Sequence, residues 1–113
     1  MEVVKIDTQF SNYTSCFKAL SDELRFNILF YLYESEEKCV CSLTEYFKTS
    51  QSALSYHLKI LADNGLLIKR QEAVWNFYAL NKEHFIFPIL EKAFKNQSEL
   101  STVDGLNMDD FNQ

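Results

Sequence analysis

The sequence predicts a mainly α-helical domain that carries one small β-hairpin. The 113 residues include only two glycines and one proline, a composition that favours helix over loops and sheets. Apolar residues recur at helical spacing along most of the chain, and alternation at strand spacing is clear only in residues 75–80. This length suits one core, so we expect a single domain over residues 1–98. Residues 99–113 hold four acidic side chains and no lysine or arginine, and we expect a flexible acidic tail.

Two helices are expected before residue 35. The first covers residues 10–20, where four apolar side chains recur at helical spacing: Phe10, Tyr13, Phe17 and Leu20. Ser21 is suited to cap the next helix, and the acidic Asp22 and Glu23 in its first turn complement the helix dipole. That second helix should bury one leucine- and isoleucine-rich face and run to about Tyr33.

A short helix and a longer one follow. Ser42, with a glutamate three residues later, has the spacing of a capping box, which predicts a short helix over residues 43–48. Ser50 can cap a helix over residues 51–63, and Gly65 can end it because glycine takes the left-handed conformation without steric cost. Two helices joined by so short a turn form the helix-turn-helix pattern.

Two short strands come next, residues 66–71 and residues 75–80, with a turn near Glu72–Val74. A hairpin directly after a helix-turn-helix is a wing. The predicted fold is therefore a winged helix-turn-helix with the element order ααααββα.

One more helix is expected after the hairpin. Asn81 can cap it, and it should run to about Lys95. Pro88 would lie in its interior, which predicts either a kink there or a helix that begins only at Phe87. Ten phenylalanines and six tyrosines are more aromatic surface than one small core needs, which suggests an oligomer interface.

The charge is unevenly distributed. A net charge of −5 alone argues against a nucleic-acid partner, but residues 48–71 carry four basic side chains against the single acidic Asp63. No stretch approaches the roughly 20 apolar residues of a membrane span, and the N-terminus lacks the pattern of a secretory signal. We therefore expect a cytoplasmic protein with no membrane partner, in a compartment where thiols stay reduced.

The outer face of the helix over residues 51–63 is polar. If its leucines face inward, the side chains that face outward are Gln51, Ser52, Ser55, Tyr56 and Lys59. Such groups bind base edges and phosphates when a helix enters a major groove, although for an isolated helix a solvated polar face is the simpler interpretation. Its place between a capped helix and a hairpin favours double-stranded DNA. The predicted DNA-binding residues are Ser50, Gln51, Ser52, Ser55, Tyr56, His57, Lys59, Lys69 and Arg70.

Within that set the expected roles differ. Gln51 could read adenine, whereas the serines and Lys59 are better placed to hold phosphates, and Tyr56 to pack on sugar or a thymine methyl. His57 lies one step from the polar face and could be a core histidine, a DNA contact or a metal ligand. No carboxylate or cysteine lies at helical spacing from it, which favours the first two roles.

At this point four stretches resemble, in order and spacing, the bacterial ArsR/SmtB family of metal-sensing repressors. They are ALSDELRFNILFYL, CVCSLTEYF, SQSALSYHLKILADNGLL and WNFYAL, and together they span about residues 19–80. The resemblance implies a homodimer, paired through its first and last helices, that binds operator DNA until a metal or metalloid releases it. It further implies an arsenite, antimonite, cadmium or lead effector and no organic cofactor. The implied dimer-interface residues are Phe10, Tyr13, Phe17, Phe85, Ile89 and Phe94.

The sequence departs from the family pattern at three places. Thr44 stands where arsenic-type members often have a third cysteine. A zinc-type site in the last helix appears absent, since His84 and the residues near Lys95 do not match its ligands. The wing tip at residues 72–74 has neither glycine nor a basic side chain, which leaves Lys69 and Arg70 on the preceding strand for phosphate contact.

Cys39 and Cys41 are candidate metal ligands. Thiolates are soft ligands that suit arsenite, antimonite, cadmium and lead. At positions i and i+2 the two side chains share one side only in an extended or irregular segment, which is plausible before a cap at Ser42. Either cysteine alone could equally be a small buried side chain. Trivalent arsenic needs three sulfur ligands, and Cys16 is the only other thiol; it could be the third ligand, or it could face the core or the dimer interface.

Other functions stay open at this stage. The third ligand could instead be water or an external thiol, and the same cysteine pair could act as a redox switch by forming a disulfide. A winged-helix protein-interaction module is a further alternative. An enzyme is not expected, because Ser55 and His57 lack an orienting acid and no glycine-rich phosphate loop is present.

Overall fold

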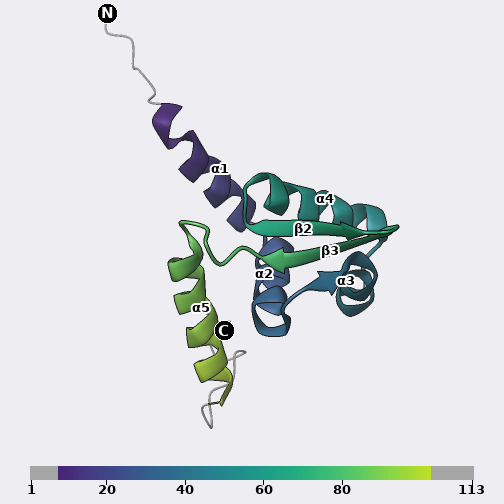
Figure 1. Ribbon diagram of the computed structural model, residues 1–113. Helices are drawn as coiled ribbons and strands as arrows, with labels where there is room; N and C mark the ends of the chain where they lie inside the picture. The colour runs from purple at the N-terminus through teal and green to yellow at the C-terminus, as the bar shows by residue number, and fades with distance from the viewer. Residues whose placement is uncertain (1–7, 103–113) are drawn as a thin grey trace, which may run out of the picture. The chain divides into compact units, whose positions relative to one another are not determined.

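The computed structural model describes residues 8–102 of the chain (Figure 1). The chain divides into two compact units, Met1–Asn81 and Lys82–Gln113, and each is considered on its own. The prediction of one domain over residues 1–98 therefore stays a prediction. The described part of the first unit holds a short 3₁₀ helix, four α-helices and three strands, and that of the second holds one α-helix.

The helices of the first unit follow the predicted order, with shifted starts. They are the 3₁₀ turn Thr8–Phe10, α1 (Ser11–Leu20), α2 (Glu23–Ser35), α3 (Val40–Phe47) and α4 (Gln51–Asp63). The predicted cap at Ser21 is wrong: Asp22 caps α2 by accepting a hydrogen bond from the Arg25 backbone N–H at 3.0 Å. The Ser21 hydroxyl instead donates to the Lys18 carbonyl at the end of α1. A carboxylate is the better acceptor for the free N–H groups of a first turn.

The start of α3 also differs from the prediction. The helix begins at Val40, three residues earlier than expected, and its cap is Cys39 and not Ser42. The sulfur of Cys39 accepts a hydrogen bond from the Ser42 backbone N–H at 3.2 Å. Sulfur is a weak acceptor that cap preferences do not rank, so the local sequence pointed to the serine.

Helix α4 matches its prediction at both ends. The Ser50 hydroxyl accepts from the Ala53 N–H at 3.2 Å, and Gly65 adopts φ 72° just past the helix. The buried leucines of α4 are Leu54, Leu58 and Leu61. They join the leucines and isoleucine of α2 and α3 in a core whose members are at most 1% exposed: Ile28, Leu29, Leu32, Leu43, Leu54, Leu58 and Leu61.

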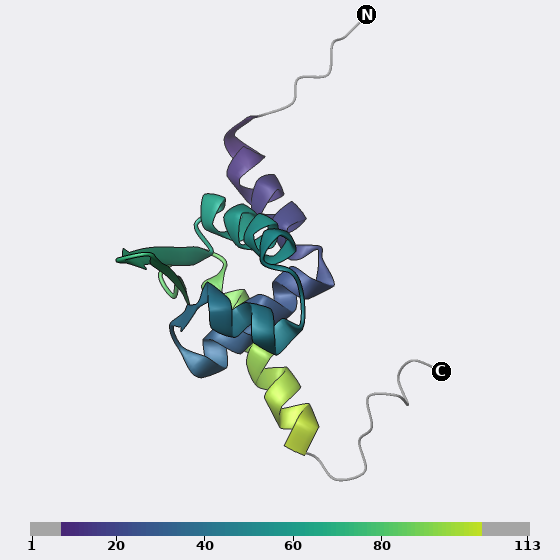
Figure 2. The same cartoon turned by 90° about the vertical axis from the view of Figure 1, so that its right-hand side faces the viewer.

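The sheet has one more strand than expected. The hairpin β2 (Leu67–Glu72) and β3 (Trp75–Leu80) was predicted, but a two-residue strand β1 (Lys38–Cys39) pairs antiparallel with β3 and gives the order β1-β3-β2. Cys39 lies opposite Phe77, and Phe77 lies opposite Arg70 of β2. In Figure 2 the hairpin extends away from the helices of the unit. The segment that carries the cysteines is thus hydrogen-bonded to the base of the wing.

The second unit begins at Lys82 and contains α5 (Phe87–Thr102). The predicted cap at Asn81 is wrong, because its side-chain amide donates to the Gly65 carbonyl at 2.8 Å and holds the end of β3. The alternative start at Phe87 is confirmed: Pro88 then lies in the first turn, where its missing N–H has no partner to lose. The helix also runs past Lys95, so residues 99–102 of the predicted tail are helical. The remainder, residues 103–113, lies outside the described residues.

No helix in the described range, residues 8–102, is both long and apolar enough to cross a membrane.

Candidate nucleic-acid interface and effector site

The outward face of α4 carries the side chains that the sequence placed there. Gln51, Ser52, Ser55, Tyr56 and Lys59 are all exposed, and the Tyr56 ring is 63% exposed. The helix presents them because its leucines occupy the opposite side in the core. This geometry exposes hydroxyl, amide and ammonium groups on one face, and their contact with DNA stays a prediction.

Two of the cationic side chains predicted to contact DNA form ion pairs within the chain. The Lys59 ammonium donates to the Asp63 carboxylate at 2.8 Å one turn later on α4, and this bond raises the lysine pKa. Arg70 on β2 is held by Glu37 and by Glu72. Lys69 is exposed and makes no ion pair with any residue in 8–102. Phosphate groups would therefore compete with carboxylates for Lys59 and Arg70, but not for Lys69.

The Arg70 side chain is the most heavily engaged cation of the wing. Its Nε and one terminal nitrogen donate to the two oxygens of Glu37 at 3.0 and 2.7 Å, and the other terminal nitrogen donates to Glu72 at 2.7 Å. The guanidinium carbon also lies 4.6 Å from the ring centroid of Phe77. These bonds raise the pKa of Arg70 above its usual value and lower the pKa of Glu37. Arg70 thus joins the wing to the residue two positions before Cys39.

The wing tip is apolar. A two-residue turn at Ala73–Val74 joins the strands, with Ala73 at φ 54°. The side chains of Val74 and Trp75 are 82% and 54% exposed. The Ala73–Val74 turn itself therefore offers apolar contact to a partner, while Glu72 just before it is acidic.

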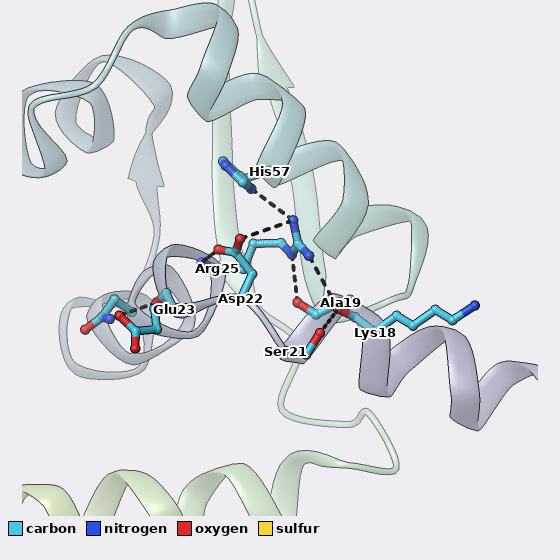
Figure 3. Close-up of polar contacts among 8 residues, drawn as sticks. Lys18, Ala19, Ser21, Asp22, Glu23, Arg25 and His57 are labelled. Carbon is cyan, nitrogen blue, oxygen red and sulfur yellow. Dashed lines mark hydrogen bonds and ion pairs between the residues drawn. The ribbon is translucent and has the colours of Figure 1, made fainter.

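His57 contacts another polar side chain instead of facing outward alone. It is half-buried on α4, and its Nδ1 lies 3.1 Å from a terminal nitrogen of Arg25 on α2 (Figure 3). Arginine only donates, so the imidazole accepts through Nδ1. Of the roles left open for His57, the structure shows this contact with a polar side chain, and no group of three or more potential metal ligands occurs within residues 8–102.

The cysteine pair lies where the chain passes from β1 into α3. Cys39 is the last residue of the strand and caps the helix, while Cys41 is in the first helical turn. The two Cα atoms are 5.3 Å apart, and the sulfur atoms are bonded as a disulfide. The side chains thus share one side, as the sequence required. Reduction would leave two thiols adjacent to each other at a helix N-terminus, where the positive end of the dipole favours thiolate.

A pocket of about 210 Å³ adjoins Cys41, the more exposed cysteine of the pair. It lies between the first turns of α3 and α4 and the wing tip, and its lining residues are Val40, Cys41, Thr44, Gln51, Val74, Trp75 and Asn76. The side-chain oxygen of Asn76 is buried and has no hydrogen-bond partner within residues 8–102. One space therefore borders Cys41, the first residue of α4 and the wing.

The donor set fits a soft ion in type but is incomplete in number. Two adjacent sulfur atoms match arsenic, antimony, cadmium or lead better than an oxygen-loving cation. No group of three or more histidine, cysteine or acidic side chains able to hold a metal occurs within residues 8–102. Cys16 is buried on α1 and its pKa is raised by burial, so within one subunit it does not join the pair. Cys16 as a third ligand could only come from a second subunit.

Most of the predicted interface residues are exposed. On α1 and the turn before it, Phe10, Tyr13 and Phe17 are 53%, 47% and 53% exposed and follow helical spacing. In the second unit Phe85 and Ile89 are 48% and 65% exposed. Phe94 is only 2% exposed, and its role as an interface residue stays a prediction.

Sequence reasoning missed three groups: Arg25, Glu37 and Asn76. Arg25 and His57 are 32 residues apart, and Glu37 and Arg70 are 33 apart, so no local spacing indicates either contact. Arg25 had one local signal, its position three residues after an acidic cap, which predicts a charge near the start of α2 but not its partner on α4.

The chain is similar to several known proteins. Residues 22–69 match the family model described as bacterial regulatory protein, arsR family. The arsenical resistance operon repressor of Bacillus subtilis (strain 168) is 48% identical over 71 residues, which are 63% of this chain and 68% of that protein. A cadmium resistance transcriptional regulatory protein CadC homolog of Staphylococcus aureus is 36% identical over 87 residues, 77% of this chain and 71% of that one. Among solved structures, HlyU from Vibrio cholerae N16961 superposes with a TM-score of 0.71 at 30% identity, covering 82% of this chain and 99% of that chain.

Proposed function

Because the chain belongs to the ArsR family of bacterial regulatory proteins, we propose that it is a homodimeric, cytoplasmic repressor that soft metal or metalloid ions release from operator DNA. The family is one of transcriptional regulators and not of enzymes. The Bacillus subtilis relative is a repressor of an arsenical resistance operon, and the Staphylococcus aureus relative is a cadmium resistance regulatory protein homolog. Both support an effector of this chemical class.

The position of the cysteine pair carries the proposal. Cys39 and Cys41 have adjacent sulfur atoms at the start of α3. Through β1, Cys39 is paired with Phe77 of the wing, and Cys41 shares a pocket with Gln51 of α4. A ligand on these sulfur atoms therefore acts where α3, α4 and the wing meet.

In this proposal Cys39 and Cys41, once reduced, hold the ion, and the ion supplies strong bonds to sulfur that constrain the start of α3. The Cys39 sulfur currently accepts the Ser42 N–H, so engaging its lone pairs weakens the cap. Any shift of α3 is passed to α4, because the two helices pack together in the leucine core. In this proposal the shifted state fits DNA poorly. A ligand that prefers that state weakens DNA binding, and DNA weakens ligand binding by the same factor.

The test measures DNA release directly. Reduced protein is bound to a fluorescent duplex from upstream of its own gene and titrated with arsenite, antimonite or cadmium while anisotropy is recorded. We expect Cys39→Ser and Cys41→Ser to bind the duplex like the native protein and to resist release. Normal release from the double variant would refute the cysteine site. A Cys16→Ser variant tests the third ligand: reduced sensitivity supports a contribution from the partner subunit.

DNA binding itself is tested by its salt dependence. Each phosphate contact contributes a slope of about −0.9 in log affinity against log salt concentration. We expect a steep slope carried in part by Lys69, because that cation has no competing carboxylate in the described structure. A flat slope would favour the protein-interaction alternative.

The disulfide favours a second candidate, a thiol redox regulator. Oxidation of the two thiols removes two protons and two electrons and forms the Cys39–Cys41 bond, with a peroxide or a disulfide as the electron acceptor. The two mechanisms separate cleanly: a redox regulator is released by a disulfide oxidant without metal, whereas a metal sensor is released by arsenite in the presence of a phosphine reductant.

A further inference from the structure

The Arg25 side chain joins three helices of the first unit. It lies at the N-terminus of α2, and its side chain is only 13% exposed. Figure 3 shows its guanidinium between the last turn of α1 and His57 of α4. Its Nε donates to the Ala19 carbonyl at 2.8 Å, one terminal nitrogen donates to the Lys18 carbonyl at 3.4 Å, and the other donates to His57 Nδ1 at 3.1 Å.

The contacts with α1 fix one end of this connection. The last carbonyl groups of a helix have no partner within it, and a cation at that end is also favoured by the helix dipole. The planar guanidinium donates in fixed directions, so it sets an orientation that a lysine ammonium would not. The Asp22 carboxylate lies 4.0 Å from the same guanidinium while it caps α2, and this environment lowers the aspartate pKa.

The contact with His57 fixes the other end. Because the guanidinium has no acceptor, His57 must present an unprotonated Nδ1, which leaves the proton of the neutral ring on Nε2. In Figure 3 the second ring nitrogen points away from Arg25. Two further kinds of contact attach α4. Its leucines are buried in the core, which is strong but non-directional, and the Ser15 hydroxyl of α1 donates to the side-chain oxygen of Asn64, the C-cap of α4, at 2.6 Å. The Arg25–His57 and Ser15–Asn64 hydrogen bonds are therefore directional contacts that together constrain how α4 is rotated relative to α1.

Resting on the proposed dimeric DNA-binding function, we propose that Arg25 and His57 are positioning residues that set the separation and angle of the two recognition helices. If α1 pairs the subunits, each α4 is held to the dimer helix through this guanidinium and, at its C-terminal end, through the Ser15–Asn64 hydrogen bond. Dimeric helix-turn-helix proteins read half-sites about one helical turn of DNA apart, so the rotation of α4 decides which spacing fits. Arg25 then determines specificity for operator spacing without touching DNA.

The experiment compares duplexes in which the two half-sites are moved together or apart by one base pair, and a duplex with one half-site. The native protein should prefer one spacing by about tenfold or more, as expected for the cost of deforming protein or DNA to fit another. Arg25→Lys should keep its affinity for the single half-site while the preference falls to about threefold or less. Glu23→Gln, an exposed change in the same helical turn, is the matched control and should keep the full preference.

Three results overturn the proposal. If Arg25→Lys keeps the native spacing preference, the inference fails and the proposed function stands. If the native protein binds no specific DNA, both fail. A measurement on the native protein removes dependence on the variant's folding: ¹⁵N shifts of the His57 ring should show an unprotonated Nδ1 and a protonated Nε2 near neutral pH. The opposite tautomer would show that Arg25 does not donate to this ring.

Discussion

Two hydrogen bonds, of 3.0 and 2.7 Å, join the guanidinium of Arg70 on the wing to the carboxylate of Glu37, two residues before Cys39. Both side chains are solvent-accessible, so the pair adds little to stability. Its effect is on availability: a cation on the proposed DNA-binding strand is held by a carboxylate of the proposed sensor segment. A substitution of Glu37 should therefore change how available Arg70 is for DNA, and a substitution of Arg70 should change the surroundings of Glu37.

Glu37→Gln should strengthen operator binding. The neutral amide removes one of the two carboxylates that engage Arg70 and leaves Glu72, so Arg70 becomes more available to phosphate. Affinity should rise a few-fold, and the salt slope should steepen by up to about one phosphate contact. Anisotropy titrations at several salt concentrations measure both quantities. Glu34→Gln, another exposed acidic-to-amide change, is the control, because it removes the same charge without touching Arg70. An equal gain in both variants would indicate a general charge effect and contradict the specific role of Glu37.

Thr44→Cys should convert an incomplete site into one with three thiols. Thr44 lines the same pocket as Cys41 and lies one helical turn after it, with its hydroxyl donating to the Cys41 carbonyl at 2.8 Å. Arsenic(III) prefers three sulfur ligands, so arsenite should bind at least about tenfold more tightly. Thiolate-to-metal absorption of the reduced protein reports the binding. Thr49→Cys, at a position outside this pocket, should give no gain; unchanged arsenite affinity in Thr44→Cys would show that the native third ligand is already supplied.

Cys16 should be the unreactive thiol of the reduced protein. It is 1% exposed and burial raises its pKa, so both access and thiolate fraction are low. Mass spectrometry after brief alkylation should find label on Cys39 and Cys41 first and on Cys16 only in denaturant. Cys16→Ser should lower the free energy of unfolding by about 1–3 kcal/mol, because it buries a hydroxyl group. Rapid labelling of Cys16 in the native protein would contradict the burial.

Asp22 should contribute an acid-sensitive part of the stability. The N–H of Arg25 and the nearby guanidinium hold the Asp22 pKa below its usual value near 3.9, so the folded state favours the charged carboxylate. This contribution is present in full above the unfolded pKa and is lost as the pH falls through the folded pKa. Urea unfolding at pH 7 should find the native protein more stable than Asp22→Asn. The difference should shrink below about pH 4; a constant difference across this range would contradict the shift.

The helix caps and helix ends that depend on one side chain and its sequence neighbours could be predicted from the sequence. Ser50 caps α4 and Gly65 ends it because each role depends on one side chain and its nearest neighbours. Pro88 predicted either a kink or a start at Phe87, and the start at Phe87 is the one observed. Non-local pairing could not be predicted in the same way: β1 is two residues long and exists only because Cys39 meets Phe77, 38 positions later.

The candidate site shows the same division. The polar face of α4 follows from helical period, and its exposure agrees with expectation. The engagement of Arg70 by Glu37 and of His57 by Arg25 depends on tertiary contacts across more than thirty residues.

The chain's only tryptophan, Trp75, stands at the base of the wing turn and lines the pocket that Cys41 and Gln51 also line. Trp75 is 54% exposed and borders the same pocket as Cys41 and the first residue of α4. The protein therefore carries an intrinsic fluorophore close to both its proposed metal site and its proposed DNA-binding helix. Emission from one side chain should report metal loading by quenching and DNA docking by a change in wavelength, with no label attached.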